Sequence, residues 1–105
     1  MKQYDVYWID LNPTTGSEVN KTRPCVIISP DEMNLYLNTI IIAPLTTALK
    51  PYPFRINCIF AKKEASIALD QIRTIDKMRI QNYVGRLNPP TIEKLKNIIK
   101  EMLVD

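Results

Sequence analysis

A polar loop and a buried strand meet in one stretch of this chain, Gly16-Ser17-Glu18-Val19-Asn20-Lys21-Thr22-Arg23-Pro24 followed by Cys25-Val26-Ile27-Ile28. The apolar run predicts a strand over residues 24–29, which places Arg23 at the start of a rigid element. A guanidinium is always charged and donates paired hydrogen bonds, so Arg23 in this position suits a phosphate ligand. An arginine that simply closes a surface loop fits the same pattern, and both readings stay open at this point.

Working outward from this stretch, short strands alternate with turn formers. Strands are expected over residues 4–11, 24–29, 39–45 and 54–60, within 65–73, and over 84–87. In the first strand we expect Val6 and Trp8 to face the core. In the third, Pro44 is expected to mark an edge or the end of pairing.

The remaining elements are helical. Residues 31–35 are expected to form one helical turn, and residues 75–81 a turn or a short helix. A longer helix begins at Asn88, a candidate N-cap followed by two prolines. Its apolar residues recur at helical spacing: Ile92, Leu95, Ile98, Ile99, Met102 and Leu103. The pattern predicts one α+β, mainly β domain over residues 1–105, a small, partly open antiparallel barrel with a C-terminal helix.

Composition narrows the chemistry. The 105 residues carry a net charge of +3 and no histidine, which excludes Ser-His and Cys-His nucleophile pairs and histidine-based zinc sites. Cys25 and Cys58 are isolated in apolar runs and are expected to be free buried thiols. The sequence has no apolar run of membrane-spanning length and no signal-peptide pattern at its start, so we expect a cytoplasmic protein that does not enter a membrane.

Three segments together resemble the MazF/PemK family of bacterial toxins, in the family's order and spacing over nearly the whole chain. The first joins Asp10-Leu11-Asn12-Pro13-Thr14 to Gly16-Ser17-Glu18 and Thr22-Arg23-Pro24. The second is Pro44-Leu45-Thr46-Thr47, followed by Lys50 and Tyr52-Pro53-Phe54. The third is Asp70-Gln71-Ile72-Arg73-Thr74-Ile75-Asp76-Lys77.

This resemblance implies an SH3-like barrel of the CcdB/PemK-like class and an mRNA interferase. Such toxins are homodimers that cut single-stranded mRNA at short sequences without a metal or other cofactor, and a cognate antitoxin inhibits them. The resemblance assigns catalytic roles to Arg23 and Thr46. It matches Glu18 to a loop acid of some members and Asp70 to an acid of PemK-type relatives.

The chain departs from the family pattern at several places, among them positions where some relatives carry a histidine, at Ser17 or Thr22, or an arginine, at Ala68. Val19-Asn20-Lys21 replaces a common Gln-x-Gly, and Tyr4 stands where a glycine is usual. These departures leave the general base and the recognised RNA sequence unassigned. Glu18 could be solvated, and Asp70 could instead pair with Arg73 or Lys77.

The residues support RNA cleavage by 2′-hydroxyl attack, because that step needs no metal-bound hydroxide. Arg23 can meet the developing phosphorane charge, and Thr46 can donate to a phosphate oxygen or satisfy the backbone. Residues expected to bind RNA through charge, hydroxyls or base stacking are Ser17, Lys21, Thr47, Lys50, Tyr52, Phe54, Arg73, Lys77 and Arg79. Phe54 equally suits core packing. The same basic surface could accept a disordered acidic antitoxin tail.

Two other functions remain open on the same barrel. One is a toxin that acts by protein contact, similar to the gyrase poison CcdB, although this chain lacks the Trp-Gly-Ile tail of those proteins. The other is a catalytically dead RNA-binding module.

Overall fold

The structure, a computed structural model, describes residues 1–11 and 22–104. Its elements in chain order are β1 (Asp5–Asp10), β2 (Thr22–Ile27), α1 (Asp31–Tyr36), β3 (Thr39–Thr46), β4 (Arg55–Phe60), β5 (Lys63–Ala68), η1 (Leu69–Gln71), β6 (Arg73–Asp76), η2 (Lys77–Arg79), β7 (Ile80–Arg86), α2 (Pro89–Ile99) and η3 (Lys100–Val104).

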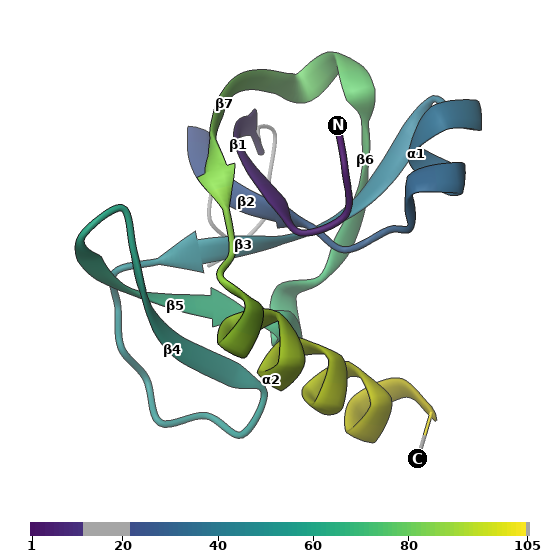
Figure 1. The fold of residues 1–105 in the computed structure, drawn as a ribbon. Coiled ribbons are helices and arrows are strands. Elements are labelled where there is room, and N and C mark those ends of the chain that lie inside the picture. The colour runs from purple at the N-terminus through teal and green to yellow at the C-terminus, as the bar shows by residue number, and fades with distance from the viewer. Residues whose placement is uncertain (12–21, 105) are drawn as a thin grey trace.

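The described strands form one curled antiparallel sheet in the order β4-β5-β3-β2-β1-β7, with β6 pairing β3 (Figure 1). Strand β3 changes partner along its length: residues 39–42 pair with β6, and residues 45–46 pair with β5. The sheet curls toward a barrel whose ends, β4 and β7, do not pair. This arrangement confirms the predicted mainly β, partly open barrel with a C-terminal helix.

Pro44 does not end β3, which continues to Thr46. It is, however, the last residue of β3 paired with β2, opposite Cys25, in line with the expected end of pairing. Proline has no N–H to donate to a ladder. Here it falls between the stretch of β3 that pairs with β6 and the stretch that pairs with β5. The sequence also failed to separate β6 from β5, because β6 has only four residues and pairs with β3, which is distant in sequence.

Two apolar clusters lie on opposite faces of the sheet. The helix-side cluster comprises Val6, Val26, Ala43, Leu45, Ile56, Ala65, Ile67, Leu69, Leu87 and Leu95. The opposite cluster comprises Ile9, Leu11, Cys25, Ile27, Ile40, Ile42 and Ile75. Alternation along β2 and β3 sends successive side chains to the two faces in turn.

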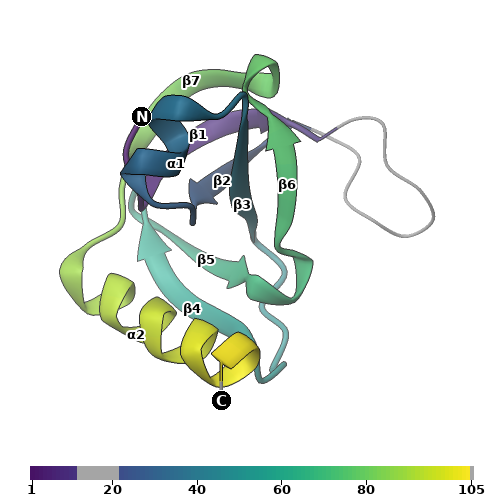
Figure 2. The same cartoon turned by 90° about the vertical axis from the view of Figure 1, so that its right-hand side faces the viewer.

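Helix α2 covers the helix-side cluster at the β4–β5 end of the barrel (Figure 2). Its predicted N-cap is confirmed, since the Asn88 side chain accepts a hydrogen bond from the Thr91 N–H at 2.9 Å. Leu95 is fully buried, and Ile92, Ile98, Ile99 and Met102 pack beside it. Among the described helices, none has both the length and the apolar character needed to cross a bilayer.

For β1, the prediction that Val6 and Trp8 face the core is correct for one of the two residues. Val6 is fully buried, but Trp8 on the same face is 41% exposed, so its expected place in the core is wrong. Alternation correctly gives the side to which Trp8 points. At that end of β1 the curled sheet is open, and the indole borders a cleft instead of the core.

Among the residues that the structure describes, three that are not glycine have left-handed backbone conformations: Tyr4 at φ 72°, Ala61 at φ 52° and Lys62 at φ 65°. Tyr4 stands where the resemblance places a glycine, and it keeps the backbone shape for which glycine is best suited. Ala61 and Lys62 form the two-residue turn between β4 and β5. Two positive φ angles at such a turn favour Asn-Gly, so the Ala-Lys pair is strained.

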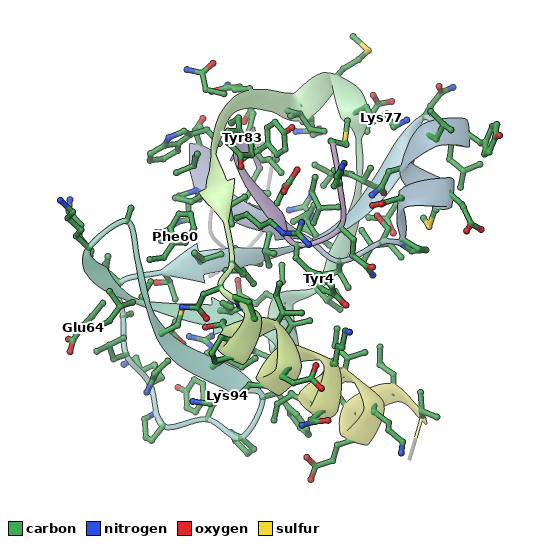
Figure 3. All side chains as sticks on the ribbon, viewed as in Figure 1. Tyr4, Phe60, Glu64, Lys77, Tyr83 and Lys94 are labelled. Atoms are coloured by element: carbon green, nitrogen blue, oxygen red, sulfur yellow. The ribbon has the colours of Figure 1, made fainter. Side chains whose placement is uncertain are left out.

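An aromatic ring reaches across part of the gap between β4 and β7, which also holds a cavity lined by residues of both strands. Phe60 at the end of β4 lies toward β7 (Figure 3), where its Cζ would be 3.2 Å from a Cβ added to Gly85. A contact this short requires the neighbouring atoms to give way. The missing side chain at residue 85 therefore lets the ring sit against β7.

Replacing Ala61-Lys62 with Asn-Gly should stabilise the protein by about 1 kcal/mol, because both residues then adopt positive φ at low cost. For a domain of this size we expect the Tm to rise by roughly 4–8 °C. Thermal unfolding followed by circular dichroism measures this shift. A control variant, Leu49→Gly, changes an exposed position that lacks a left-handed backbone and should not raise the Tm. An unchanged Tm for Asn-Gly would show that the turn is not strained.

Candidate active site

Strand pairing brings Arg23 and Thr46 together. Strands β2 and β3 are antiparallel, with Cys25 opposite Pro44 and Val26 opposite Ala43. Continuing that register by two residues sets Arg23 opposite Thr46. Residues that face each other across an antiparallel pair point to the same side of the sheet, and their Cβ atoms are about 4.5–5.5 Å apart.

Arg23 and Thr46 also line one cleft, with a volume of about 460 Å³. The cleft lies between the ends of β2 and β3, the β4–β5 hairpin and β7. Its other lining residues are Trp8, Pro24, Leu45, Thr47, Phe60, Ala61, Lys63, Glu64, Ala65 and Val84. The cleft therefore has mostly apolar walls, with the arginine and two threonines at one end.

The Arg23 guanidinium has an unused donor. Its Nε is buried and makes no hydrogen bond among the described residues. A buried N–H without an acceptor is costly, so such a group is a natural place for an anionic ligand to bind.

The Thr46 hydroxyl is oriented by the chain itself. Its Oγ1 accepts a hydrogen bond from the Ala48 N–H at 3.1 Å, just beyond the end of β3. The backbone-satisfying role that the sequence left open is therefore present. It does not exclude a role toward a ligand, because the hydroxyl proton remains available for donation.

Ser66 lies next in the same row, opposite Thr46 on β5. Its side chain is fully buried, and its Oγ has no hydrogen-bond partner within the described part of the chain. Sequence reasoning did not select this serine, because a hydroxyl within the run Ala65-Ser66-Ile67-Ala68 carries no motif.

A nucleophilic thiol is not available at this site. Burial raises the pKa of the Cys25 thiol to about 12, and the positive charges of Arg73 and Arg23 offset this only in part. At neutral pH Cys25 is therefore protonated and behaves as an apolar core residue. Its position among the apolar side chains of the opposite cluster agrees with the prediction of a buried free thiol.

Asp70 lies in η1 and is not among the residues that line the cleft. Arg55 at the start of β4 holds both of its oxygens: Nε donates to Oδ1 at 2.8 Å and Nη2 to Oδ2 at 3.1 Å. The hydrogen bonds from Arg55 lower the pKa of Asp70. The ion-pair partner is thus Arg55, in place of the Arg73 or Lys77 considered from sequence.

The residues expected to bind RNA occupy different surroundings. Lys50 is exposed in the loop after β3, and Tyr52 in the same loop is 51% exposed. Phe54 is half-buried against the helix-side cluster, as expected for its packing role.

The basic residues of the third segment lie on β6 and η2. Arg73 is opposite Ile42 of β3, on the same face of the sheet as Arg23 and Thr46. Arg79 donates to the Asp10 carbonyl at 3.3 Å, and Lys77 is half-buried in η2 (Figure 3). Ser17, Glu18 and Lys21 lie outside the described residues.

Sequence reasoning missed several residues that line the cleft, among them Trp8, Phe60, Lys63 and Glu64. Phe60 lies between the hairpin and β7, whereas Glu64 projects from the outer side of the hairpin (Figure 3). No local motif marks them. The short break between the strands expected over residues 54–60 and within 65–73 was the available signal, because it allows a hairpin there.

Fold and site together define a small β-barrel protein whose cleft presents a permanent cation beside a hydroxyl. A sequence profile described as PemK-like, MazF-like toxin of type II toxin-antitoxin system matches residues 2–103. The chain belongs to this toxin family, which confirms the predicted family.

Two curated relatives carry the name of a ribonuclease. The chain is 35% identical to Endoribonuclease MazF of Staphylococcus saprophyticus over 94% of this chain and 88% of that protein. It is 33% identical to Endoribonuclease EndoA of Bacillus subtilis, over 95% and 91% of the two chains. These relatives confirm the predicted endoribonuclease class and do not favour the protein-contact toxin or the inactive module.

Solved structures confirm the fold. The crystal structure of MazF from Deinococcus radiodurans superposes with a TM-score of 0.85 at 19% identity, covering 98% of this chain and 96% of that one. An endoribonuclease from a mycobacterial species, solved in complex with its cognate antitoxin, gives a TM-score of 0.83 at 21% identity and covers 98% and 94%.

The Arg55–Asp70 pair predicts a pH-dependent effect of Asp70→Asn. Because the folded-state pKa of Asp70 is lowered, its stabilising contribution is present above the unfolded pKa of about 3.9 and is lost as the pH falls through the folded pKa. The Asp70 side chain is 37% exposed, so solvent screening limits the loss at pH 7 to about 1 kcal/mol.

Urea unfolding of both proteins at pH 7 and at pH 3 measures this difference. It should be clear at pH 7 and shrink toward zero at pH 3. Glu93→Gln, which removes the carboxylate of a long 3.9 Å pair with Lys96, is the control and should change stability little at either pH. A destabilisation by Asp70→Asn that is equal at both pH values would contradict the prediction.

Proposed function

We propose that this protein is a sequence-specific, metal-independent endoribonuclease toxin that cleaves single-stranded mRNA by attack of a ribose 2′-hydroxyl. The observation that carries the proposal is the shared cleft of Arg23 and Thr46, with the Arg23 Nε buried and without a partner among the described residues. Family membership and the names of the relatives support the reaction class.

In this reaction the 2′-oxygen forms a bond to the adjacent phosphorus while the bond from phosphorus to the 5′-oxygen breaks. The 2′-hydroxyl proton passes to a base, and the leaving 5′-oxygen gains a proton. The products are a 2′,3′-cyclic phosphate and a 5′-hydroxyl end. The transition state carries more charge on its non-bridging oxygens than the ground state does, so donors placed there accelerate the step.

Arg23 and Thr46 meet that charge in the proposal. The guanidinium donates two parallel hydrogen bonds, and the Thr46 hydroxyl donates a third while its oxygen is held by the Ala48 N–H. Arg23 does not serve as the base, because a guanidinium stays protonated in proteins.

Glu18 is the proton acceptor that we propose. The segment that contains it leaves β1 after Leu11 and returns at Thr22, and Thr22 is opposite Asp10 and next to Arg23. Both ends of the segment thus lie beside the arginine. The alternative acid, Asp70, has both oxygens bound by Arg55.

The remaining parts of the proposal concern partners. RNA binding would use Ser17, Lys21, Thr47, Lys50, Tyr52, Arg73, Lys77 and Arg79, with Phe54 mainly in a packing role. We also propose a homodimer in the cytoplasm, inhibited by a cognate antitoxin whose disordered acidic tail competes with RNA for this cationic surface. The relative solved with its cognate antitoxin supports such a partner.

Arg23→Ala should lower the rate of cleavage by roughly a hundred- to a thousandfold, as loss of a preorganised oxyanion donor does elsewhere. The assay incubates purified protein with a long mixed-sequence RNA in excess EDTA, and sequencing of the ends reports the cleaved positions. Lys96→Ala removes one positive charge from α2, away from the cleft, and should cut as wild type does. Intact RNA with the wild-type protein, or equal cleavage by Arg23→Ala, would refute the proposal.

Thr46→Val and Thr46→Ser separate the hydroxyl from the shape of the side chain. Valine keeps the branched shape but removes the hydroxyl, so we expect a loss of roughly ten- to a hundredfold in single-turnover rate. Serine keeps the hydroxyl and should retain most of the rate. If valine and serine cut equally well, the hydroxyl takes no part in the reaction.

A further inference from the structure

Three side chains form a stack at the loop that follows β3. They are Tyr52 in that loop, Arg55 at the start of β4 and Asp70 in η1. The Asp70 carboxylate binds the Arg55 guanidinium through two hydrogen bonds, of 2.8 and 3.1 Å. The guanidinium carbon of Arg55 in turn lies 5.0 Å from the centroid of the Tyr52 ring. The Arg55 side chain is 8% exposed, so it is enclosed by this arrangement.

The backbone at Tyr52 is restrained as well. Pro51 and Pro53 flank it, and proline fixes φ and narrows the choices of the preceding residue. The Arg55 N–H donates to the Tyr52 carbonyl at 3.2 Å and closes a turn, while the Leu69 N–H donates to the Phe54 carbonyl at 3.1 Å. Tyr52 is thus held from its backbone and from its ring, with half of its surface open to solvent.

The stack is connected to the candidate active site by short structural links. The loop 47–54 begins directly after Thr46, and its first residue, Thr47, lines the cleft. The segment η1, which contains Asp70, lies against β3. Tyr52 thus follows Thr46 by six residues, in a loop that begins at the edge of the cleft.

We propose that Tyr52 is a stacking platform for one nucleobase of the bound single strand, and that Asp70 is a positioning residue that acts through Arg55. A guanidinium that is pinned by a carboxylate holds one side of the ring by cation–π contact. The open side is then presented to a base at little entropic cost. This inference rests on the proposed ribonuclease function and assigns Asp70 a role other than proton transfer.

Two observations favour positioning over proton transfer for Asp70. Both of its oxygens are occupied by Arg55, so a proton transfer would first have to break a bidentate, charge-assisted pair. It is also absent from the residues that line the cleft of Arg23 and Thr46. The Arg55 side chain is buried and paired with Asp70, so it is poorly placed to contact a phosphate.

The test measures binding and cleavage separately. Binding uses a randomised pool of 2′-O-methyl RNA 12-mers that carry 2-aminopurine, because these cannot be cleaved and their fluorescence reports stacking. Cleavage is measured as the single-turnover rate at saturating protein on a long RNA in EDTA. The variants are Tyr52→Ala, Tyr52→Phe, Asp70→Asn and Arg55→Lys, with Glu93→Gln as the matched loss of a paired carboxylate on α2. Thermal unfolding checks that each variant is folded.

Tyr52→Ala should weaken binding of the pool by roughly five- to a hundredfold and remove the stacking signal, whereas Tyr52→Phe should bind as wild type does. Asp70→Asn and Arg55→Lys should weaken binding by roughly two- to tenfold, since they remove preorganisation but no direct contact. Tyr52→Ala, Asp70→Asn and Arg55→Lys should each lower the single-turnover rate at saturation by a smaller factor than they weaken binding, because the reacting groups are unchanged. Glu93→Gln should match wild type in both measurements.

A loss of roughly a hundredfold or more in the saturated rate of Asp70→Asn, with binding unchanged, would identify Asp70 as a proton-transfer group and overturn the inference. Unchanged binding for Tyr52→Ala and Asp70→Asn would overturn it too. Failure of the proposed function has a different signature, which is wild-type protein that leaves the long RNA intact.

Discussion

The site depends on the antiparallel pairing of β2 with β3. Its register, continued two residues beyond the last pair, Cys25 with Pro44, sets Arg23 opposite Thr46, at the point where one strand begins and the other ends. Apolar side chains on both faces fix that register, because a slip by one residue would turn Cys25 and Ile27 away from the opposite cluster and Val26 away from the helix-side cluster. The packing of the core thus determines where the Arg23 guanidinium and the Thr46 hydroxyl lie.

The fold makes two potentially reactive groups, the Cys25 thiol and the Asp70 carboxylate, unavailable for proton transfer or nucleophilic attack. Burial keeps the Cys25 thiol protonated, and Arg55 occupies the Asp70 carboxylate. What remains at the end of β2 and β3 is a fixed positive charge with a buried donor that no described residue engages. Such a group stabilises negative charge that develops in a transition state without having to change its own protonation state.

Much of the fold could be predicted from the sequence, because its signals are local. The apolar run after Arg23 and the Asn88 cap each identify an element without knowledge of its neighbours. The errors arise where segments distant in sequence determine the burial or the pairing of a residue. Trp8 follows the correct alternation but borders an opening in the barrel, and β3 continues beyond Pro44, where its pairing with β2 ends, because it then pairs with β5. The candidate site shows the same difference between local and distant signals. Local motifs pointed to Arg23 and Thr46. The partner of Asp70 is Arg55, 15 residues away in sequence, and the register of β4 with β5 brings the two together.

The contact between Phe60 and Gly85 carries a consequence for how this sequence can diverge. The two residues belong to the unpaired ends of the sheet, and a Cβ at residue 85 would lie 3.2 Å from the tip of the ring. A residue larger than glycine at 85 therefore needs the ring at 60 to shift, so each position constrains the other. Among homologues the two positions should covary, as a physical pair linking segments that share no backbone hydrogen bonds.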